Sequence, residues 1–171
     1  SIRLKSDSYV SLVYQGICQD KASKYSDAVN SLKTAAGIEP NNPLAHSQLG
    51  LTYYGGKNYV ESERSLRRAV QLKPDDYFYR YRLGLALYEQ ERYGEAMTEA
   101  KESIRLKSDY SYAHGLYGDT LYGAKQYKEA VVEYRESLRL KPGDASVHYQ
   151  LGQSYYGLKD WASASVAFRE T

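Results

Sequence analysis

The sequence predicts an all-α protein built from antiparallel helical hairpins that stack in register. Three observations support this prediction. The chain repeats itself every 34 residues, each repeat holds two segments with apolar residues at helical spacing, and a proline ends the second segment of most repeats. Self-similarity at this length is typical of stacked-repeat proteins, in which each hairpin buries its apolar face on its neighbours.

Several columns of residues carry the period. Glycine recurs at Gly16, Gly50, Gly84, Gly118 and Gly152. An aromatic column consists of Tyr25, Tyr59, Tyr93, Tyr127 and Trp161, and a column of small residues consists of Ala28, Ser62, Ala96, Ala130 and Ala164. We interpret the glycine and small-residue columns as points where two helices approach within about 8–10 Å.

The period places the elements in order. Residues 1–8 are predicted to be the tail of a preceding repeat, which suggests a fragment of a longer chain. Four repeats follow at 9–42, 43–76, 77–110 and 111–144, and an incomplete last repeat occupies 145–171. In 43–76 the two helices are separated near Gly55, Gly56 and Lys57, and Pro74 with Asp75 and Asp76 marks the turn into the next repeat.

The arrangement resembles the tetratricopeptide repeat. Two repeats show the pattern in full: Leu49-Gly50, Tyr53, Tyr59, Ser62, Leu66, Ala69 and Pro74, then Tyr117-Gly118, Leu121, Tyr127, Ala130, Tyr134, Ser137 and Pro142. The resemblance implies an α-solenoid whose hairpins form a right-handed superhelix. One column departs from it, because the place where the family often has Trp holds Leu12, His46, Arg80, His114 and His148.

The two ends of the chain are in phase with each other. The segment SIRLKSD at residues 1–7 recurs at 103–109. A head-to-tail association, in which residues 1–7 of one molecule dock on the last repeat of another, is therefore one hypothesis. The alternative is that the ends are only boundaries within a longer protein.

Composition excludes several classes of protein. No apolar run is long enough to span a membrane, and the first twenty residues lack the pattern of a signal peptide. We therefore expect a soluble chain; the sequence leaves its compartment unknown, with the cytoplasm as the expected location. The net charge of +2 is too small to indicate nucleic acid by itself. Among 171 residues there are 20 Tyr but only 2 Phe and 1 Trp, a composition that suits half-buried contact faces.

We expect neither catalysis nor a cofactor. No phosphate loop, nucleophile elbow or paired-carboxylate motif is present. His46, His114 and His148 share one repeat phase, and stacking separates them too far to bind one metal, so we interpret them as partly buried structural residues. Cys18 shares a column of small residues and is predicted to be buried.

A basic column leaves a second function open. It consists of Lys33, Arg67, Lys101, Arg135 and Arg169. Such a stripe could bind nucleic acid. However, Glu102 precedes Arg105 by three residues, as Glu136 precedes Arg139, and this spacing favours local ion pairs on a solvated helix face.

The resemblance implies a concave groove, lined by the first helix of each hairpin, that holds a peptide or protein. By repeat phase the groove residues would be Leu51, Tyr54, Phe78, Tyr81, Leu85, Tyr88, Tyr112, Asp119, Tyr122, Tyr149, Gln153 and Tyr156. Arrays that clamp acidic tails use Lys, Asn and Arg there, and here only Arg82 fits. We therefore predict a scaffold whose Tyr-rich groove grips apolar or aromatic anchors. The alternatives are that the tyrosines serve packing alone, or that the chain recruits substrates for a larger enzyme.

Overall fold

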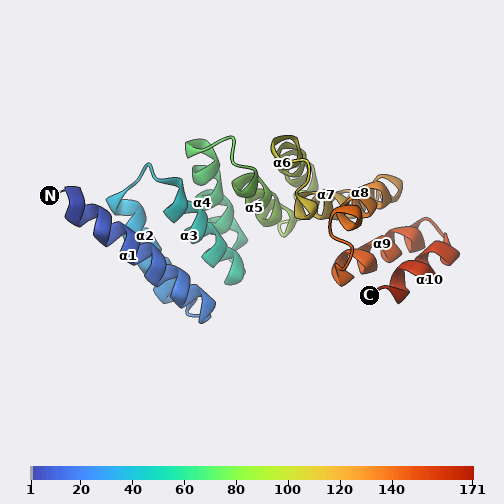
Figure 1. The fold of residues 1–171 in the computed structure, drawn as a ribbon, viewed down its shortest axis with the longest axis horizontal. Helices are drawn as coiled ribbons and strands as arrows, with labels where there is room; N and C mark the ends of the chain where they lie inside the picture. The colour runs from blue at the N-terminus through green and yellow to red at the C-terminus, as the bar shows by residue number, and fades with distance from the viewer. Residues whose placement is uncertain (1) are drawn as a thin grey trace. The chain divides into compact units, whose positions relative to one another are not determined.

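The computed structural model describes residues 2–171, with side chains from residue 7 onward. Over this range the chain forms ten α-helices and no strand, which confirms the predicted all-α class (Figure 1). The helices are α1 (Ile2–Lys21), α2 (Tyr25–Ile38), α3 (Pro43–Gly55), α4 (Tyr59–Leu72), α5 (Tyr77–Tyr88), α6 (Tyr93–Leu106), α7 (Ser111–Gly123), α8 (Tyr127–Leu140), α9 (Ala145–Gly157) and α10 (Trp161–Arg169). Odd-numbered helices are the first helices of the hairpins and even-numbered helices are the second.

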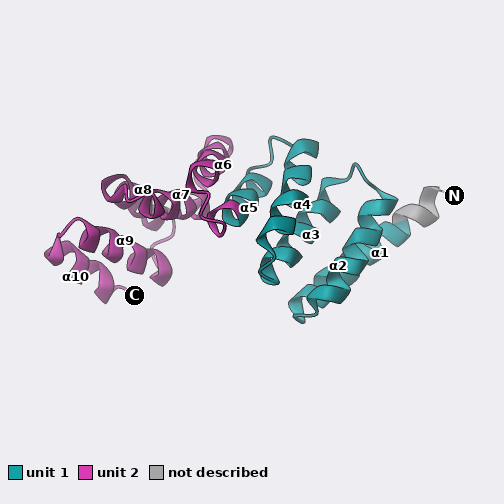
Figure 2. Ribbon diagram, turned by 180° about the vertical axis from the view of Figure 1, so that it is seen from behind, with its two compact units in different colours: residues 1–86 teal, residues 87–171 magenta. Residues whose placement is uncertain are grey.

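The chain divides into two compact units, residues 1–86 and 87–171, with the boundary inside α5 (Figure 2). In the first unit α1 packs on α2, α2 on α3 and α3 on α4, while α1 also contacts α3. In the second unit α6 to α10 pack in the same serial way, and α7 contacts α9. Within each unit the hairpins therefore pack on one another, as predicted for an α-solenoid.

The glycine column marks the close approach of the two helices of a hairpin. A Cβ atom on Gly50 would lie 2.5 Å from Leu66 Cγ, and one on Gly118 would lie 2.6 Å from Tyr134 Cε1. Gly16 meets Leu32 and Gly152 meets Phe168 in the same way. The predicted role of these glycines is confirmed, since any larger residue would push the paired helices apart.

The aromatic column packs against the end of the following first helix. A Cβ atom on Gly55 would lie 2.9 Å from the Tyr25 ring, and one on Gly123 would lie 2.7 Å from the Tyr93 ring. These glycines have negative φ, so they are required for space and not for an unusual backbone conformation. The tyrosine rings thereby pack between one hairpin and the next.

The turn between paired helices contains a left-handed residue that is never glycine. Its positions again follow the 34-residue step: Ser23, Lys57, Glu91, Lys125 and Lys159, with φ between 57° and 61°. The turn predicted near Gly55, Gly56 and Lys57 is confirmed. Its left-handed residue is Lys57, a conformation that costs an ordinary side chain about 1–2 kcal/mol.

The turns between hairpins are closed by polar caps. Asp76 Oδ1 accepts hydrogen bonds from the backbone N–H groups of Phe78 (3.0 Å) and Tyr79 (3.2 Å), which starts α5. Asn42 accepts one from the N–H of Leu44 at the start of α3. The turn predicted at Pro74–Asp76 is thus confirmed, with Asp76 as the cap.

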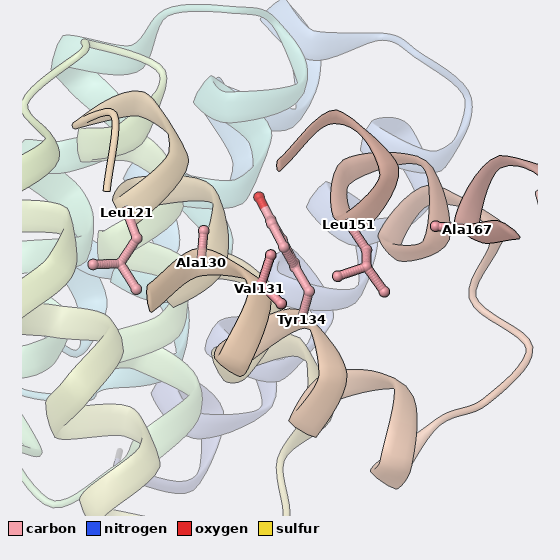
Figure 3. Close-up of a cluster of buried hydrophobic side chains, with 6 residues drawn as sticks. All are labelled: Leu121, Ala130, Val131, Tyr134, Leu151 and Ala167. Carbon is pink, nitrogen blue, oxygen red and sulfur yellow. The ribbon is translucent and has the colours of Figure 1, made fainter. Parts of the chain in front are cut away.

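The core of the second unit is a continuous layer between α7, α8, α9 and α10. Figure 3 shows six of its buried side chains, Leu121, Ala130, Val131, Tyr134, Leu151 and Ala167. Tyr134 is the largest of them and is fully buried. Its hydroxyl therefore needs a polar partner inside the unit.

The first helix differs from the prediction. Asp7 and Ser8 lie within α1, so the helix continues across the boundary predicted between residues 8 and 9. The side chains of residues 1–6, on which the head-to-tail hypothesis depends, lie outside the described part of the chain. None of the described helices is both long enough and apolar enough to cross a bilayer.

Candidate functional site

The predicted groove residues lie on α3, α5, α7 and α9, and all of them are at least partly exposed. We call them the first-helix surface and describe it separately for each unit. In the first unit the Phe78 and Tyr81 rings stack with centroids 6.3 Å apart. The Arg82 guanidinium lies 3.9 Å from the Phe78 ring centroid and donates a hydrogen bond to Ser47 Oγ at 2.7 Å. Leu51, Tyr54 and Leu85 are half-buried.

In the second unit the surface is richer in exposed rings. Tyr112, Tyr149 and Tyr156 are 45%, 50% and 58% exposed. Two of them are held by hydrogen bonds: Lys141 Nζ donates to the Tyr112 hydroxyl (3.0 Å), and Gln153 Nε2 donates to the Tyr149 hydroxyl (2.7 Å). These rings are therefore both accessible and positioned.

One tyrosine column of the surface also has a packing role. Each ring lies against the aromatic residue that begins the next helix, in the pairs Tyr54–Tyr59, Tyr88–Tyr93, Tyr122–Tyr127 and Tyr156–Trp161, with centroids 4.9–5.6 Å apart. Such pairs stabilise a turn beyond their buried area. Repetition of tyrosine here is thus explained by packing, and a binding role must rest on the exposed parts of the rings.

Asp119 is the one carboxylate predicted for the surface, and it sits in an unusual environment. The Tyr134 hydroxyl, from the core of the unit, donates a hydrogen bond to Asp119 Oδ1 at 2.8 Å. Burial raises the pKa of Asp119 to about 6, against the smaller lowering effect of the Tyr134 hydrogen bond. The side chain is nevertheless partly exposed in its own right. It is a recessed carboxylate that still reaches the surface.

Tyrosines surround this carboxylate. Burial and the nearby Asp119 charge raise the pKa of Tyr88 to about 12, and the same two causes raise the pKa of Tyr134 further. The tyrosines are therefore neutral at any physiological pH. The role of Tyr134 was not anticipated from the sequence, although a signal existed: Tyr134 occupies the column of Leu32 and Leu66, and Asp119 occupies the column of Leu51 and Leu85.

The histidine column has a structural role, as predicted. His46 Nε2 bonds the carbonyl of Pro40 (3.0 Å) and His148 Nε2 bonds that of Pro142 (2.9 Å). His114 Nε2 bonds the Ser108 carbonyl (3.1 Å) while its Nδ1 lies 2.8 Å from Glu133 Oε2. The hydrogen bond with Glu133 raises the pKa of His114, because it favours the protonated ring. These side chains close the turns between hairpins.

Three members of the basic column, Lys33, Arg67 and Lys101, contact neighbouring side chains, and two further arginines on the second helices form local ion pairs. Arg105 pairs with Glu102 and Arg139 with Glu136, each at 2.8 Å, as the spacing predicted. Lys101 Nζ lies 5.2 Å from the Tyr117 ring centroid, and Arg67 pairs with Glu63 at 2.8 Å. This pattern is typical of a solvated face and does not favour nucleic acid.

Cys18 is exposed, so the prediction that it is buried was wrong. Its counterpart Thr52 is covered because it faces Tyr25 and Val29 of the preceding second helix. The described residues place no such helix beside Cys18. Among those residues, no group of three His, Cys, Asp or Glu side chains is arranged to hold a metal ion.

Two surface depressions lie away from the first-helix surface. One of about 350 Å³ is lined by Tyr25, Val29, Tyr53 and Asn58, and another of about 400 Å³ by Arg135, Leu151, Tyr155 and Val166. The first lies between α2 and α3 and reaches Asn58 at the start of α4, and the second is lined by α8, α9 and α10. No residue of the predicted groove lines them, so neither of these two depressions coincides with that surface.

Comparison with known families agrees with the repeat pattern. Residues 21–55 and 118–159 match a family described as TPR repeat, and residues 58–111 match one described as tetratricopeptide repeat. Among curated proteins, none matches the sequence.

Several solved structures share the fold. MamA from Desulfovibrio magneticus RS-1 is similar with a TM-score of 0.87 and 20% identity, over 96% of this chain and 93% of that one. PilF from Pseudomonas aeruginosa gives 0.86 and 20%, over 97% and 76% of the two chains. YrrB, described as a TPR protein with an unusual peptide-binding site, gives 0.75 and 17%, over 93% and 82%.

Proposed function

Because the chain belongs to the tetratricopeptide repeat family, we propose that it is a protein-interaction scaffold that binds a peptide or protein on its Tyr-rich first-helix surface. Repeats of this family generally act as scaffolds without catalysis, and we assign the chain no catalytic role. YrrB, which shares the fold, is described as having a peptide-binding site. This supports the class of function without identifying a partner.

The observation that carries the proposal is the set of exposed aromatic rings on α7 and α9. Tyr112, Tyr149 and Tyr156 each expose about half of their surface, and each is held by a hydrogen bond or a ring contact. A ring that is already fixed loses little entropy when a partner covers it. Aromatic anchors of this kind carry much of the energy of protein interfaces.

The surface favours a partner with apolar or aromatic anchors over an acidic tail. At the positions where tail-clamping arrays have Lys, Asn or Arg, this chain has one matching residue, Arg82. The Arg82 guanidinium stacks on the Phe78 ring and donates a hydrogen bond to Ser47. The rest of the first unit's surface, Leu51, Tyr54, Tyr81 and Leu85, is apolar or aromatic.

The proposal is tested by affinity capture with the immobilised chain and two variants. Tyr112→Ala with Tyr149→Ala removes two exposed rings of the second unit's surface and should reduce partner capture at least tenfold. Val132→Ser with Val166→Ser is the matched control, because these exposed valines lie on second helices. Circular dichroism checks that helicity survives. Equal capture by the wild type and the double Tyr variant would remove this surface from consideration.

A further inference from the structure

The Asp119 carboxylate lacks a cationic partner. Its one hydrogen bond comes from the Tyr134 hydroxyl to Oδ1, and no Lys, Arg or His in the described residues forms an ion pair with it. The charged group that acts on it is Glu89, which is also acidic. A recessed carboxylate normally acquires a compensating positive charge.

The groups around Asp119 are all suited to receive a cation. Tyr88 at the end of α5, Glu89 in the turn that follows and Tyr134 on α8 interact electrostatically with Asp119. Tyr122 follows Asp119 by three residues, on the same face of α7. Tyr93, at the start of α6, lies on the Tyr88 ring. Aromatic faces beside a carboxylate attract ammonium and guanidinium groups. Asp119 and Glu89, which act on each other electrostatically here, are both acidic.

Other hairpins of the chain form without a carboxylate at this position. The equivalent positions in the first unit hold Leu51 and Leu85, and the position of Tyr134 holds Leu32 and Leu66. The second unit thus replaces an aliphatic arrangement with a hydrogen-bonded polar pair, at the cost of a poorly solvated charge. Perturbed carboxylates of this kind are concentrated at functional sites.

We propose that Asp119, framed by Tyr88 and Tyr122, binds a lysine or arginine side chain of the partner peptide. This inference rests on the proposed function, since it specifies one anchor of a ligand on the same first-helix surface. The partner's cation forms an ion pair with Asp119 and lies against the tyrosine rings. Tyr134 acts as a positioning residue, because its hydroxyl fixes the carboxylate from inside the core.

The raised pKa of Asp119 supports this assignment. A carboxylate that burial holds near pKa 6 gains more from an incoming cation than a fully solvated one does. Binding of the cationic peptide should therefore weaken between pH 7.5 and pH 5, as Asp119 is protonated. Asp119→Asn should remove most of that pH dependence.

The probe is a set of four acetylated decapeptide amide pools. The central residue is fixed as Arg, Lys, norleucine or Glu, and the other positions are randomised over apolar and aromatic residues. The wild type should bind the Arg and Lys pools about tenfold more tightly than the norleucine pool, by fluorescence anisotropy. Asp119→Asn, which keeps an acceptor for Tyr134, should abolish this preference, and Asp119→Lys should shift it toward the Glu pool.

The outcomes separate the two proposals. If the pools bind and the Tyr112→Ala, Tyr149→Ala variant weakens their binding, but Asp119→Asn keeps the cationic preference, the cation site is wrong and the surface stands. A wild-type preference for norleucine or Glu also contradicts the cation site. If no pool binds, or if loss of both tyrosines changes nothing, the binding surface itself is overturned. Asp119→Asn must retain wild-type helicity by circular dichroism, and Asp119→Glu should keep part of the preference.

Discussion

In both units a glycine lets the two helices of a hairpin approach closely, but the side chain that packs against that glycine is apolar in one unit and polar in the other. In the first unit Gly50 makes room for the aliphatic Leu66, and the neighbouring surface position is Leu51. In the second unit Gly118 makes the same room for Tyr134, whose hydroxyl bonds Asp119. The glycine sets the helix spacing in both. Because that spacing admits either side chain, a polar pair can replace an apolar one without changing the hairpin.

The largest expected effect is on stability, and it tests the close contact between a glycine and its paired helix that both units share. Gly50→Ala and Gly118→Ala should each destabilise the chain by about 2–3 kcal/mol, because the new Cβ would lie only 2.5–2.6 Å from Leu66 or Tyr134. Thermal and urea denaturation measure the change. Gly37→Ala and Gly94→Ala are matched controls, one in each unit, since a Cβ there meets nothing within 4 Å. Removal of a helical glycine should make these two about 0.5–1 kcal/mol more stable.

A smaller effect tests the polar pair that distinguishes the second unit. Tyr134→Phe removes the donor to Asp119 and should cost about 1–3 kcal/mol, since it leaves a recessed carboxylate unsatisfied. Adding Asp119→Leu should restore most of that loss by recreating the apolar arrangement of the first unit. A double-mutant cycle by urea denaturation gives the coupling. If the changes in unfolding free energy of Tyr134→Phe and Asp119→Leu simply add in the double variant, the two side chains are not coupled.

The smallest effect concerns pH. The pKa of Asp119 is about 6 in the folded chain and near 3.8 in the unfolded one, so between these values the folded chain holds a proton that the unfolded chain has released. Wild-type stability therefore falls, relative to Asp119→Asn, as pH rises from about 4 to 6, and the difference is constant above that. Allowing for partial exposure, we expect about 1–2 kcal/mol. Thermal denaturation of both proteins from pH 4 to 7.5 measures it, and a pH-independent difference would refute the burial of this charge.

Much of the fold could be predicted because residues with the same packing role recur at the same position of several repeats. Gly16, Gly50, Gly118 and Gly152 share one packing role, and chance does not place glycine at such regular intervals. The ion pairs of Arg105 and Arg139 depend only on neighbours three residues away, so local spacing was sufficient. The hairpins and turns followed for the same reason.

The site was less predictable because its defining contacts join different helices. Asp119 and Tyr134 are 15 residues apart and meet only when α7 packs on α8. Cys18 was misjudged because its column is buried by the preceding second helix, which the described residues do not place beside it. Asp7 and Asp109 occupy the same local sequence, yet Asp7 is helical and Asp109 lies in a turn.

The sequence by itself determined the period, the helix pairs, the turns and the columns of contact residues, since these depend on patterns repeated along the chain. Only the tertiary structure decided which polar side chains face one another, how far each is withdrawn from water, and therefore which carboxylate is left with a perturbed pKa. The physical reason is that desolvation and ion pairing depend on distances between helices, whereas helix formation depends on spacing within them.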